Sequence, residues 1–162
     1  MTDLAALEAR IQRLEDLEEI KRLKYRYLRA LDTKAWDELA LTLTEDATTE
    51  YSDGAYRFKG RDAILSFLKS TPLAQPDGFV GVHHGSQPEI ELTGPSSARG
   101  IWALYNYLIH KSAEQGLRLC AFYHDEYVKV GGAWRIHATG YRRVFEETWS
   151  RKDMPSLRLT AG

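Results

Sequence analysis

Cysteine is almost absent from this chain, since Cys120 is the only one in 162 residues. A single thiol excludes a disulfide within the chain, and it excludes a metal site built from several cysteines. Such low cysteine usage agrees with the reducing conditions of the cytoplasm, so we expect a cytoplasmic protein.

The sequence also lacks long apolar runs and a net charge of either sign. No stretch reaches the ~18 consecutive apolar residues of a membrane-spanning helix. Charged residues interrupt the N-terminal segment, which is therefore unlike a signal peptide. The 22 basic and 23 acidic residues give a net charge of −1. No excess of positive charge favours nucleic acid, so we expect neither a membrane nor a nucleic-acid partner.

Several common site motifs are missing as well. We find no phosphate-binding loop and no glycine-rich dinucleotide fingerprint. Gly85-Ser86 lacks the flanking pattern of a serine nucleophile elbow. The adjacent His83 and His84 point to opposite faces of a strand, and zinc needs at least a third ligand. We therefore predict no metal site.

The first part of the chain predicts helices. Apolar residues between Leu4 and Leu31 recur every three or four positions, which predicts one long helix with a single apolar stripe. We expect its first half to pack on a neighbouring subunit or to lie across the mouth of the fold. Thr33 is predicted to cap a short second helix over 34–43. A third helix is expected to open at Gly60-Arg61-Asp62.

The second part of the chain predicts strands, because aromatic and β-branched residues are frequent and glycines separate the runs. Helices followed by a long antiparallel meander indicate an α+β fold, a strongly curved sheet wrapped over helices to form a cone with a hollow interior. The last residues, 148–162, form a polar tail. The predicted strands cover 47–51, 56–58, 79–84, 88–92, 98–110, 117–130 and 134–145.

Asn106 stands where an apolar residue is expected. By the two-residue period of a strand it shares a face with Trp102, Leu104 and Leu108. A buried amide without a partner costs about 1–3 kcal/mol, so Asn106 has a structural hydrogen bond or a ligand, or this face is exposed. The opposite face is also apolar, which predicts a subunit interface on one side of the sheet. That face carries Ile101, Ala103, Tyr105, Tyr107 and Ile109.

Four polar residues have the chemistry of an acid–base site: Tyr27, Asp32, His83 and Arg143. Each also has an ordinary interpretation, as a core phenol, a helix cap, a structural imidazole and a surface ion pair respectively. As a group they can act together, because a carboxylate orients an imidazole that moves a proton. A phenol and a guanidinium can hold an oxygen that gains charge.

A family resemblance rests on the segments 20–43, 51–54, 83–85, 88–90, 100–102, 121–123 and 139–143. In these segments the chain resembles SnoaL-like proteins, which belong with scytalone dehydratase, ketosteroid isomerase and nuclear transport factor two. Among these it is most similar to the bile acid 7α-dehydratases. The resemblance covers nearly the whole chain apart from the extreme N-terminus and the tail, and we expect one domain, 1–162, with about 15–147 as the core of the fold.

This resemblance implies a cone-shaped fold that needs no metal or organic cofactor and assembles as a homo-oligomer, a trimer or a dimer. The dehydratase residues fall on Tyr27, Asp32, His83 and Arg143, in agreement with the acid–base set. Asn106 takes an acidic position of the dehydratases, and Ser86 stands where a second histidine is expected. An amide binds substrate but does not titrate, so the general reaction type is better supported than the bile-acid reaction.

Our hypothesis is a cofactor-independent dehydratase that eliminates water from a small hydrophobic cyclic substrate, a hydroxylated ketone of steroid-like or polyketide-like kind. His83, oriented by Asp32, moves the proton, and Tyr27 binds the carbonyl or leaving oxygen. Arg143 offsets negative charge or holds Asp32. The residues expected to line the hollow are Trp36, Tyr51, Phe58, Trp102, Leu104, Asn106 and Phe122.

Two alternatives remain open. The same pocket could carry isomerase or epoxide-hydrolase chemistry, and the mass of the product separates an isomerase from a dehydratase. The chain could also be non-catalytic, as the small subunit of a ring-hydroxylating dioxygenase or as a ligand-binding module. A stable assembly with a second kind of chain would favour that last interpretation.

Overall fold

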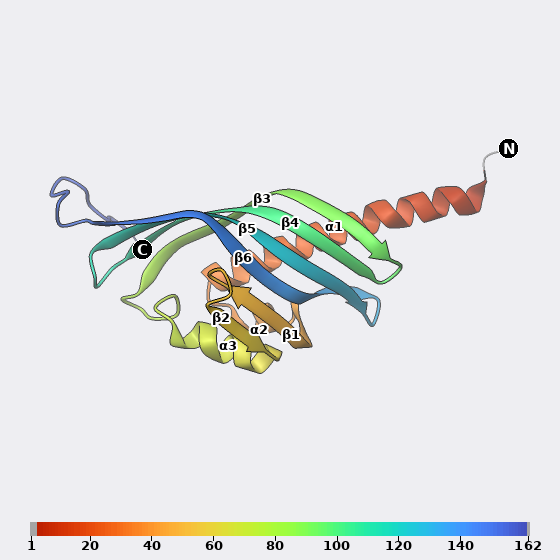
Figure 1. Ribbon diagram of the computed structural model, residues 1–162, viewed down its shortest axis with the longest axis horizontal. Coiled ribbons are helices and arrows are strands. Elements are labelled where there is room, and N and C mark those ends of the chain that lie inside the picture. Colours follow the sequence, from red (N-terminus) through yellow and green to blue (C-terminus); the bar gives the residue numbers. More distant parts are fainter. Residues whose placement is uncertain (1–2, 162) are drawn as a thin grey trace.

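The computed structural model describes residues 3–161 and shows an α+β fold of helices followed by a curved sheet (Figure 1). The helices are α1 (Leu4–Asp32), α2 (Trp36–Ala40) and α3 (Arg61–Ser70). The strands are β1 (Leu43–Tyr51), β2 (Tyr56–Lys59), β3 (Phe79–Gly94), β4 (Ser97–His110), β5 (Gln115–Val130) and β6 (Ala133–Ser150).

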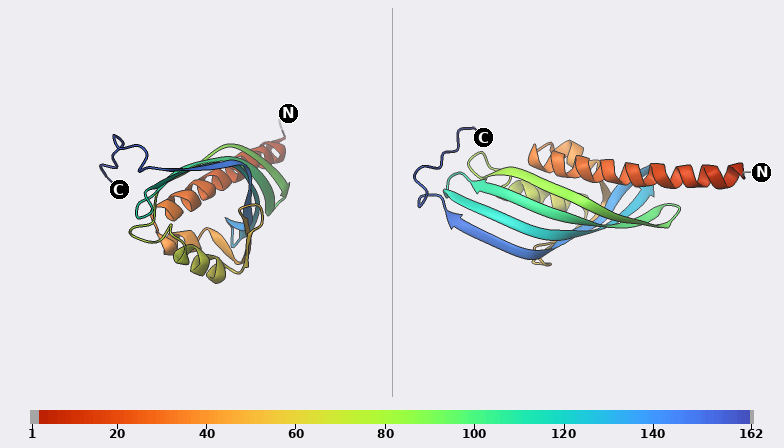
Figure 2. Two further views of the ribbon diagram at one scale, coloured as in Figure 1. Left: turned by 60° about the vertical axis from the view of Figure 1, so that its left-hand side comes forward. Right: turned by 90° about the horizontal axis from the view of Figure 1, so that it is seen from above.

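The six strands form one sheet in the order β2-β1-β6-β5-β4-β3. All neighbours pair antiparallel except β1, which runs parallel to β6. The sheet curls around α1, while α2 and α3 lie beside β1 and β2 (Figure 2). The predicted α+β cone is confirmed, with a sheet that stays open rather than closing into a barrel.

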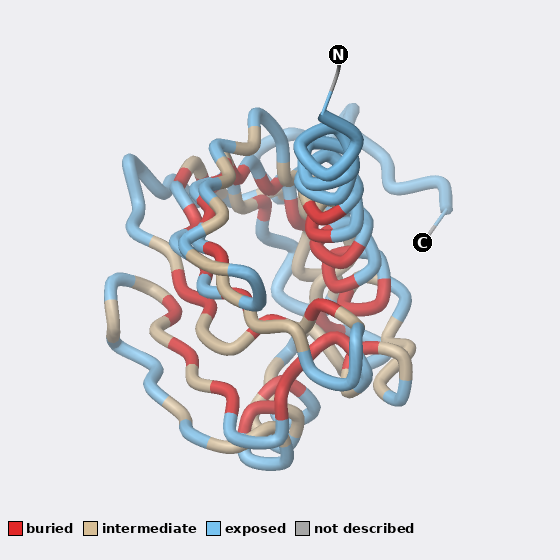
Figure 3. The backbone as a smooth tube through the Cα atoms, turned by 90° about the vertical axis from the view of Figure 1, so that its right-hand side faces the viewer, coloured by how far each residue is buried: buried red, intermediate tan, exposed pale blue. Residues whose placement is uncertain are grey.

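The core lies between α1 and the concave face of the sheet, where buried residues gather in Figure 3. Burying a large apolar side chain contributes about 1.5–3 kcal/mol, so this layer supplies much of the stability. The helix contributes Ile20, Leu23, Tyr27 and Leu31, and the sheet contributes Trp102, Leu104, Leu119, Ala121, Tyr123 and Ile136.

The single apolar stripe predicted for α1 is wrong, because the helix carries two stripes on different faces. Ile20, Leu23 and Tyr27 are buried, whereas Leu4 and Leu14 are 72% and 64% exposed. At 100° per residue, a run of three-residue steps drifts around the helix until it has changed face. The first part of α1 therefore extends beyond the sheet and does not lie across the mouth of the fold (Figure 1).

The second helix is shorter than predicted. Thr33 ends α1, since its main-chain N–H donates to the carbonyl oxygen of Arg29 and the N–H of Lys34 donates to that of Leu31. The residue before α2 is Ala35, whose side chain caps nothing, and Leu43 already belongs to β1. Thr33 is therefore a helix end rather than a helix start.

The two strands predicted over 79–84 and 88–92 are one strand, β3. Its pairing with β4 is interrupted by an irregularity between Ser86 and Glu89. Gln87 takes a positive φ of 51° there, so the local sequence resembles a turn although the strand continues. Such a bulge adds residues to one strand and bends it without ending the pairing.

The outer face of the sheet is apolar and exposed, including Tyr105, Phe122 and Phe145. The subunit interface expected on this face stays a prediction. Within residues 3–161, no helix is both long enough and apolar enough to cross a membrane.

Candidate active site

Asp32 and His83 form a buried pair between the end of α1 and strand β3. The His83 main-chain N–H donates to Oδ2 of Asp32 at 2.9 Å, and His83 Nδ1 lies 2.5 Å from Oδ1. The two side chains are only 12% and 8% exposed. Because the carboxylate occupies Nδ1, it fixes the orientation of the ring and leaves Nε2 to face another group.

The local sequence brings these two residues together at an electrostatic cost. A carboxylate at the C-terminal end of a helix meets the negative end of the helix dipole, so the two contacts with His83 offset an unfavourable position. Gly85 permits the close approach of β3, since a Cβ at that position would lie 2.5 Å from Leu28 Cδ1 of α1. Gly85 therefore allows α1 and β3 to approach closely beside the Asp32–His83 pair.

A groove of about 420 Å³ runs beside the pair between α1 and β3. This volume falls within the range of small-molecule sites, roughly 300–1,000 Å³. The lining includes Tyr25, Leu28, Asp32, Val82, His83 and Gly85.

Two buried phenols meet at the core side of α1. The hydroxyl oxygens of Tyr27 and Tyr51 are 2.8 Å apart. Burial, with Tyr51 and Tyr123 nearby, raises the pKa of Tyr27 well above its usual range, and burial also raises the pKa of Tyr51. Both phenols therefore stay protonated at neutral pH. One hydroxyl donates to the other, which keeps its own hydrogen to donate elsewhere.

Asn106 lies directly opposite His83 in the register of β3 and β4, so both side chains project from the concave face of the sheet toward α1. Asn106 is 3% exposed, and its Oδ1 atom is buried without a hydrogen-bond partner among the described residues. An unpaired buried carbonyl costs about 1–3 kcal/mol. A ligand that donates a hydrogen bond would remove this cost.

The phenol of Tyr123 is influenced electrostatically by both Asp32 and Tyr51. Burial raises the pKa of Tyr123 first, and the charges or dipoles of Tyr51, Tyr141, Asp125 and Asp32 raise it further. Within residues 3–161, no hydrogen bond links the Asp32–His83 pair to the Tyr27–Tyr51 pair.

Arg143 does not hold Asp32, and that expectation is wrong. Its Nε atom and its main-chain N–H donate to the carboxylate of Asp53, each at 2.7 Å, and Glu146 lies 3.5 Å from Nη1. Arg143 pairs with Ala121 in the β5–β6 register, three strands away from β3. Its charge is already balanced by two carboxylates.

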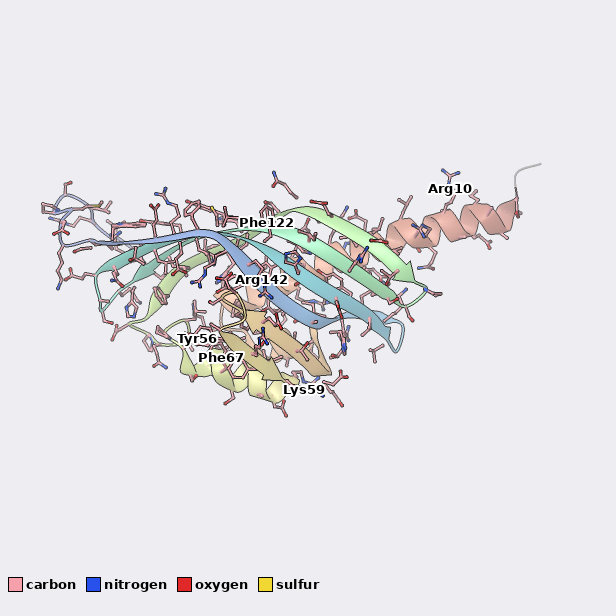
Figure 4. All side chains as sticks on the ribbon, in the orientation of Figure 1. Arg10, Tyr56, Lys59, Phe67, Phe122 and Arg142 are labelled. Atoms are coloured by element: carbon pink, nitrogen blue, oxygen red, sulfur yellow. The ribbon has the colours of Figure 1, made fainter. Side chains whose placement is uncertain are left out.

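Phe122 does not line the hollow. It is 44% exposed and alternates with the buried Ala121 and Tyr123, which places it on the outer face together with Arg142 (Figure 4). The expectation failed because both faces of β5 carry aromatic residues, so the two-residue period alone does not show which face is inside.

The remaining predicted lining residues lie on the concave side. Leu104 is buried in the core, and Trp102 is buried with its indole N–H donated to the Tyr127 hydroxyl at 2.8 Å. Phe58 stacks on Phe67 with ring centroids 4.4 Å apart. Trp36 is half-buried near α3, where it packs against the core.

Sequence reasoning missed a buried ionic cluster next to the phenols. Lys24 Nζ lies 2.7 Å from Asp125 Oδ2, and both side chains are fully buried. Asp125 also accepts hydrogen bonds from Tyr127 and Thr139, each at 2.7 Å. Burial lowers the pKa of Lys24, although Asp125 works against that shift. Lys24 Nζ is 3.6 Å from the centroid of the Tyr123 ring, which therefore packs against a cation.

A larger hollow of about 1100 Å³ crosses the outer face of the sheet. Its two arginines pair with glutamates of the same hollow, Arg99 with Glu91 and Arg142 with Glu50. Size alone therefore does not identify the site, and the buried acid–base pair is the stronger indicator. Among residues 3–161, no group of three or more histidine, cysteine, aspartate or glutamate side chains is arranged to hold a metal ion.

Residues 12–140 match the family model of the SnoaL-like domain. A scytalone dehydratase-like protein from Novosphingobium aromaticivorans superposes with a TM-score of 0.75 at 23% identity, covering 84% of this chain and 89% of that one. The type-3 hexachlorocyclohexane dehydrochlorinase LinA of Novosphingobium barchaimii gives 0.76 at 20% identity, covering 86% and 93%. An NTF2-like protein from N. aromaticivorans gives 0.74 at 21% identity, covering 89% and 92%. These similarities show a shared fold.

Proposed function

Because the chain belongs to the SnoaL-like family, we propose that it is a cofactor-independent lyase that eliminates water from a hydroxylated cyclic ketone of steroid-like or polyketide-like kind. The buried contact between Asp32 and His83 carries this proposal. Two of the structural neighbours are named for elimination reactions, a dehydratase and a dehydrochlorinase, which supports the same general chemistry.

In the proposed reaction the ketone acidifies a neighbouring C–H bond. His83 takes that proton through Nε2, and Asp32 stabilises the imidazolium cation that forms. The electron pair of the broken C–H bond becomes a C=C bond as the C–O bond breaks. The departing hydroxide takes the proton and leaves as water. General acid–base catalysis of this kind contributes ~10²–10⁴-fold to the rate.

The phenols and the amide bind the two oxygen atoms of the substrate. The free hydroxyl hydrogen of the Tyr27–Tyr51 pair can bind a carbonyl oxygen that gains charge. Asn106 Oδ1 can accept a hydrogen bond from the leaving hydroxyl, which a chloride leaving group could not donate. Asn106 therefore favours the binding of a hydroxylated substrate over that of a chlorinated one. Arg143 takes no step, since Asp53 and Glu146 bind it.

Isomerisation is a second candidate. The protonated phenol pair would stabilise an enolate whether or not a group leaves, as an isomerase requires. The two reactions differ in product mass, because only the dehydratase product has lost water.

The test incubates the purified protein with a panel of cyclic ketones that carry a hydroxyl at the carbon β to the carbonyl, and follows product mass. We expect loss of water with the wild type. Asp32→Asn and His83→Gln should lower turnover at least about a hundredfold. His124→Gln is the matched control, since His124 is exposed on the outer face of β5 and does not line the groove beside the pair, and it should keep full activity. Full activity in both site variants would refute the mechanism, and a product of unchanged mass would favour the isomerase.

A further inference from the structure

The first turns of α1 have no partner within the described chain. Residues 3–15 are all exposed, and this segment extends past the sheet, where Arg10 marks it in Figure 4. Most helical stability in proteins comes from packing of an apolar face, and nothing in the described chain packs on this segment. The match to the family model begins at residue 12, so most of this segment lies before it.

The exposed segment carries a short apolar seam. Leu4, Leu7, Ile11 and Leu14 follow the alternating spacing of three and four residues that defines positions a and d of a heptad. At 100° per residue the seam lies about 180° around the helix from the buried stripe of Ile20, Leu23 and Tyr27. The seam therefore faces away from the sheet of its own chain, and another molecule must cover it.

The charges beside the seam favour a second copy in parallel orientation. With Leu4 at position a, Glu8 and Glu15 occupy e positions and Arg10 occupies a g position. In a parallel pair, a g residue meets the e residue of the next heptad of the partner, so Arg10 meets Glu15 in both directions. An antiparallel pair would instead bring the glutamates of the e positions together.

We propose that residues 4–15 of α1 form a parallel, two-stranded coiled coil with the same segment of a second copy. Ile11 at position a with Leu7 and Leu14 at position d is the combination that favours two strands. Glu18 and Lys21 occupy the next a and d positions, so the seam ends after two heptads. Since each sheet lies on the far side of its helix, the two domains point away from each other.

The test uses single cysteines in the full chain with Cys120→Ser as background. Leu7→Cys places a thiol at position d, where parallel helices bring identical residues together, and Ala9→Cys places one at the outward position f. We expect mild oxidation to convert Leu7→Cys into a covalent dimer and to leave Ala9→Cys monomeric at the same concentration. Equal dimer formation by the two variants would overturn the proposal. Other interfaces of the protein do not affect this comparison.

A charge exchange tests the register. Arg10→Glu in the Leu7→Cys chain should lower the yield of covalent dimer, because it places a second carboxylate against Glu15. Adding Glu15→Arg should restore the yield, with circular dichroism confirming that the helix is kept. A double variant that stays as poor as Arg10→Glu would contradict the parallel pairing.

Discussion

Asn106, which lies beside His83, is placed to bind a ligand although its unpaired carbonyl lowers the stability of the fold. The two residues face each other across β3 and β4, and the amide carbonyl is buried without a partner in the described chain. Natural cores rarely keep such a group unless something else satisfies it. A substrate hydroxyl would do so at the point where His83 can reach the same molecule.

Asn106→Leu should therefore separate stability from activity. Removing the unpaired carbonyl should raise the free energy of unfolding by about 1 kcal/mol, because an apolar side chain of similar size needs no partner. The same variant should lower kcat/KM for the hydroxylated ketone at least roughly tenfold, the value of one lost hydrogen bond. Denaturant unfolding and initial rates measure the two effects. A fall in both would mean that Asn106 is structural.

At the scale of elements, α1 is fastened to the sheet by polar contacts at its middle as well as by its apolar stripe. Asp16 is buried and accepts hydrogen bonds from Lys129 at 2.5 Å and from the Trp134 indole at 3.0 Å. These residues lie near the end of β5 and the start of β6. Asp16 therefore fixes the helix just where the exposed segment begins.

Asp16→Asn should destabilise the fold in a pH-dependent way. Burial raises the pKa of Asp16, but hydrogen bonds from Lys129 and Trp134 outweigh it, so the folded pKa lies below the ordinary value. A lowered folded pKa contributes stability above the unfolded pKa and loses it as pH falls through the folded pKa. We expect a loss of about 1–3 kcal/mol at neutral pH that shrinks in acid. Denaturant unfolding at several pH values measures the loss, and the exposed Glu19→Gln serves as control. A loss that stays constant down to acid pH would contradict this role.

At the scale of the whole molecule, the sequence predicted the architecture better than the site. Periodic apolar residues indicated the long helix and the meander, because burial on one face repeats with the period of each element. Periodicity alone does not show which face of an element meets the core. For this reason we predicted Phe122 on the wrong face of β5 and assigned the two apolar stripes of α1 to a single face. The bulge at Gln87 depends on pairing with β4 and has no local signature distinct from a turn.

The candidate site was harder to predict because it joins distant segments. Asp32 and His83 are separated by 51 positions, and only the resemblance to a known family linked them. The Lys24–Asp125 pair did have a signal that we missed, since each residue interrupts an otherwise apolar face of its element. Arg143 failed as a partner of Asp32 because nearby Asp53 competes for it, a contact made by the fold rather than by a motif. The bile-acid branch of the family and the oligomeric state stay predictions.

The most direct measurement of the central claim is hydrogen exchange into a cyclic ketone that lacks the leaving hydroxyl. In heavy water, a protein whose His83 removes the proton beside the carbonyl should label that carbon without any elimination. We predict rapid labelling by the wild type and by His124→Gln, and labelling slower by at least about a hundredfold with His83→Gln. Equal labelling by the wild type and His83→Gln would contradict the account.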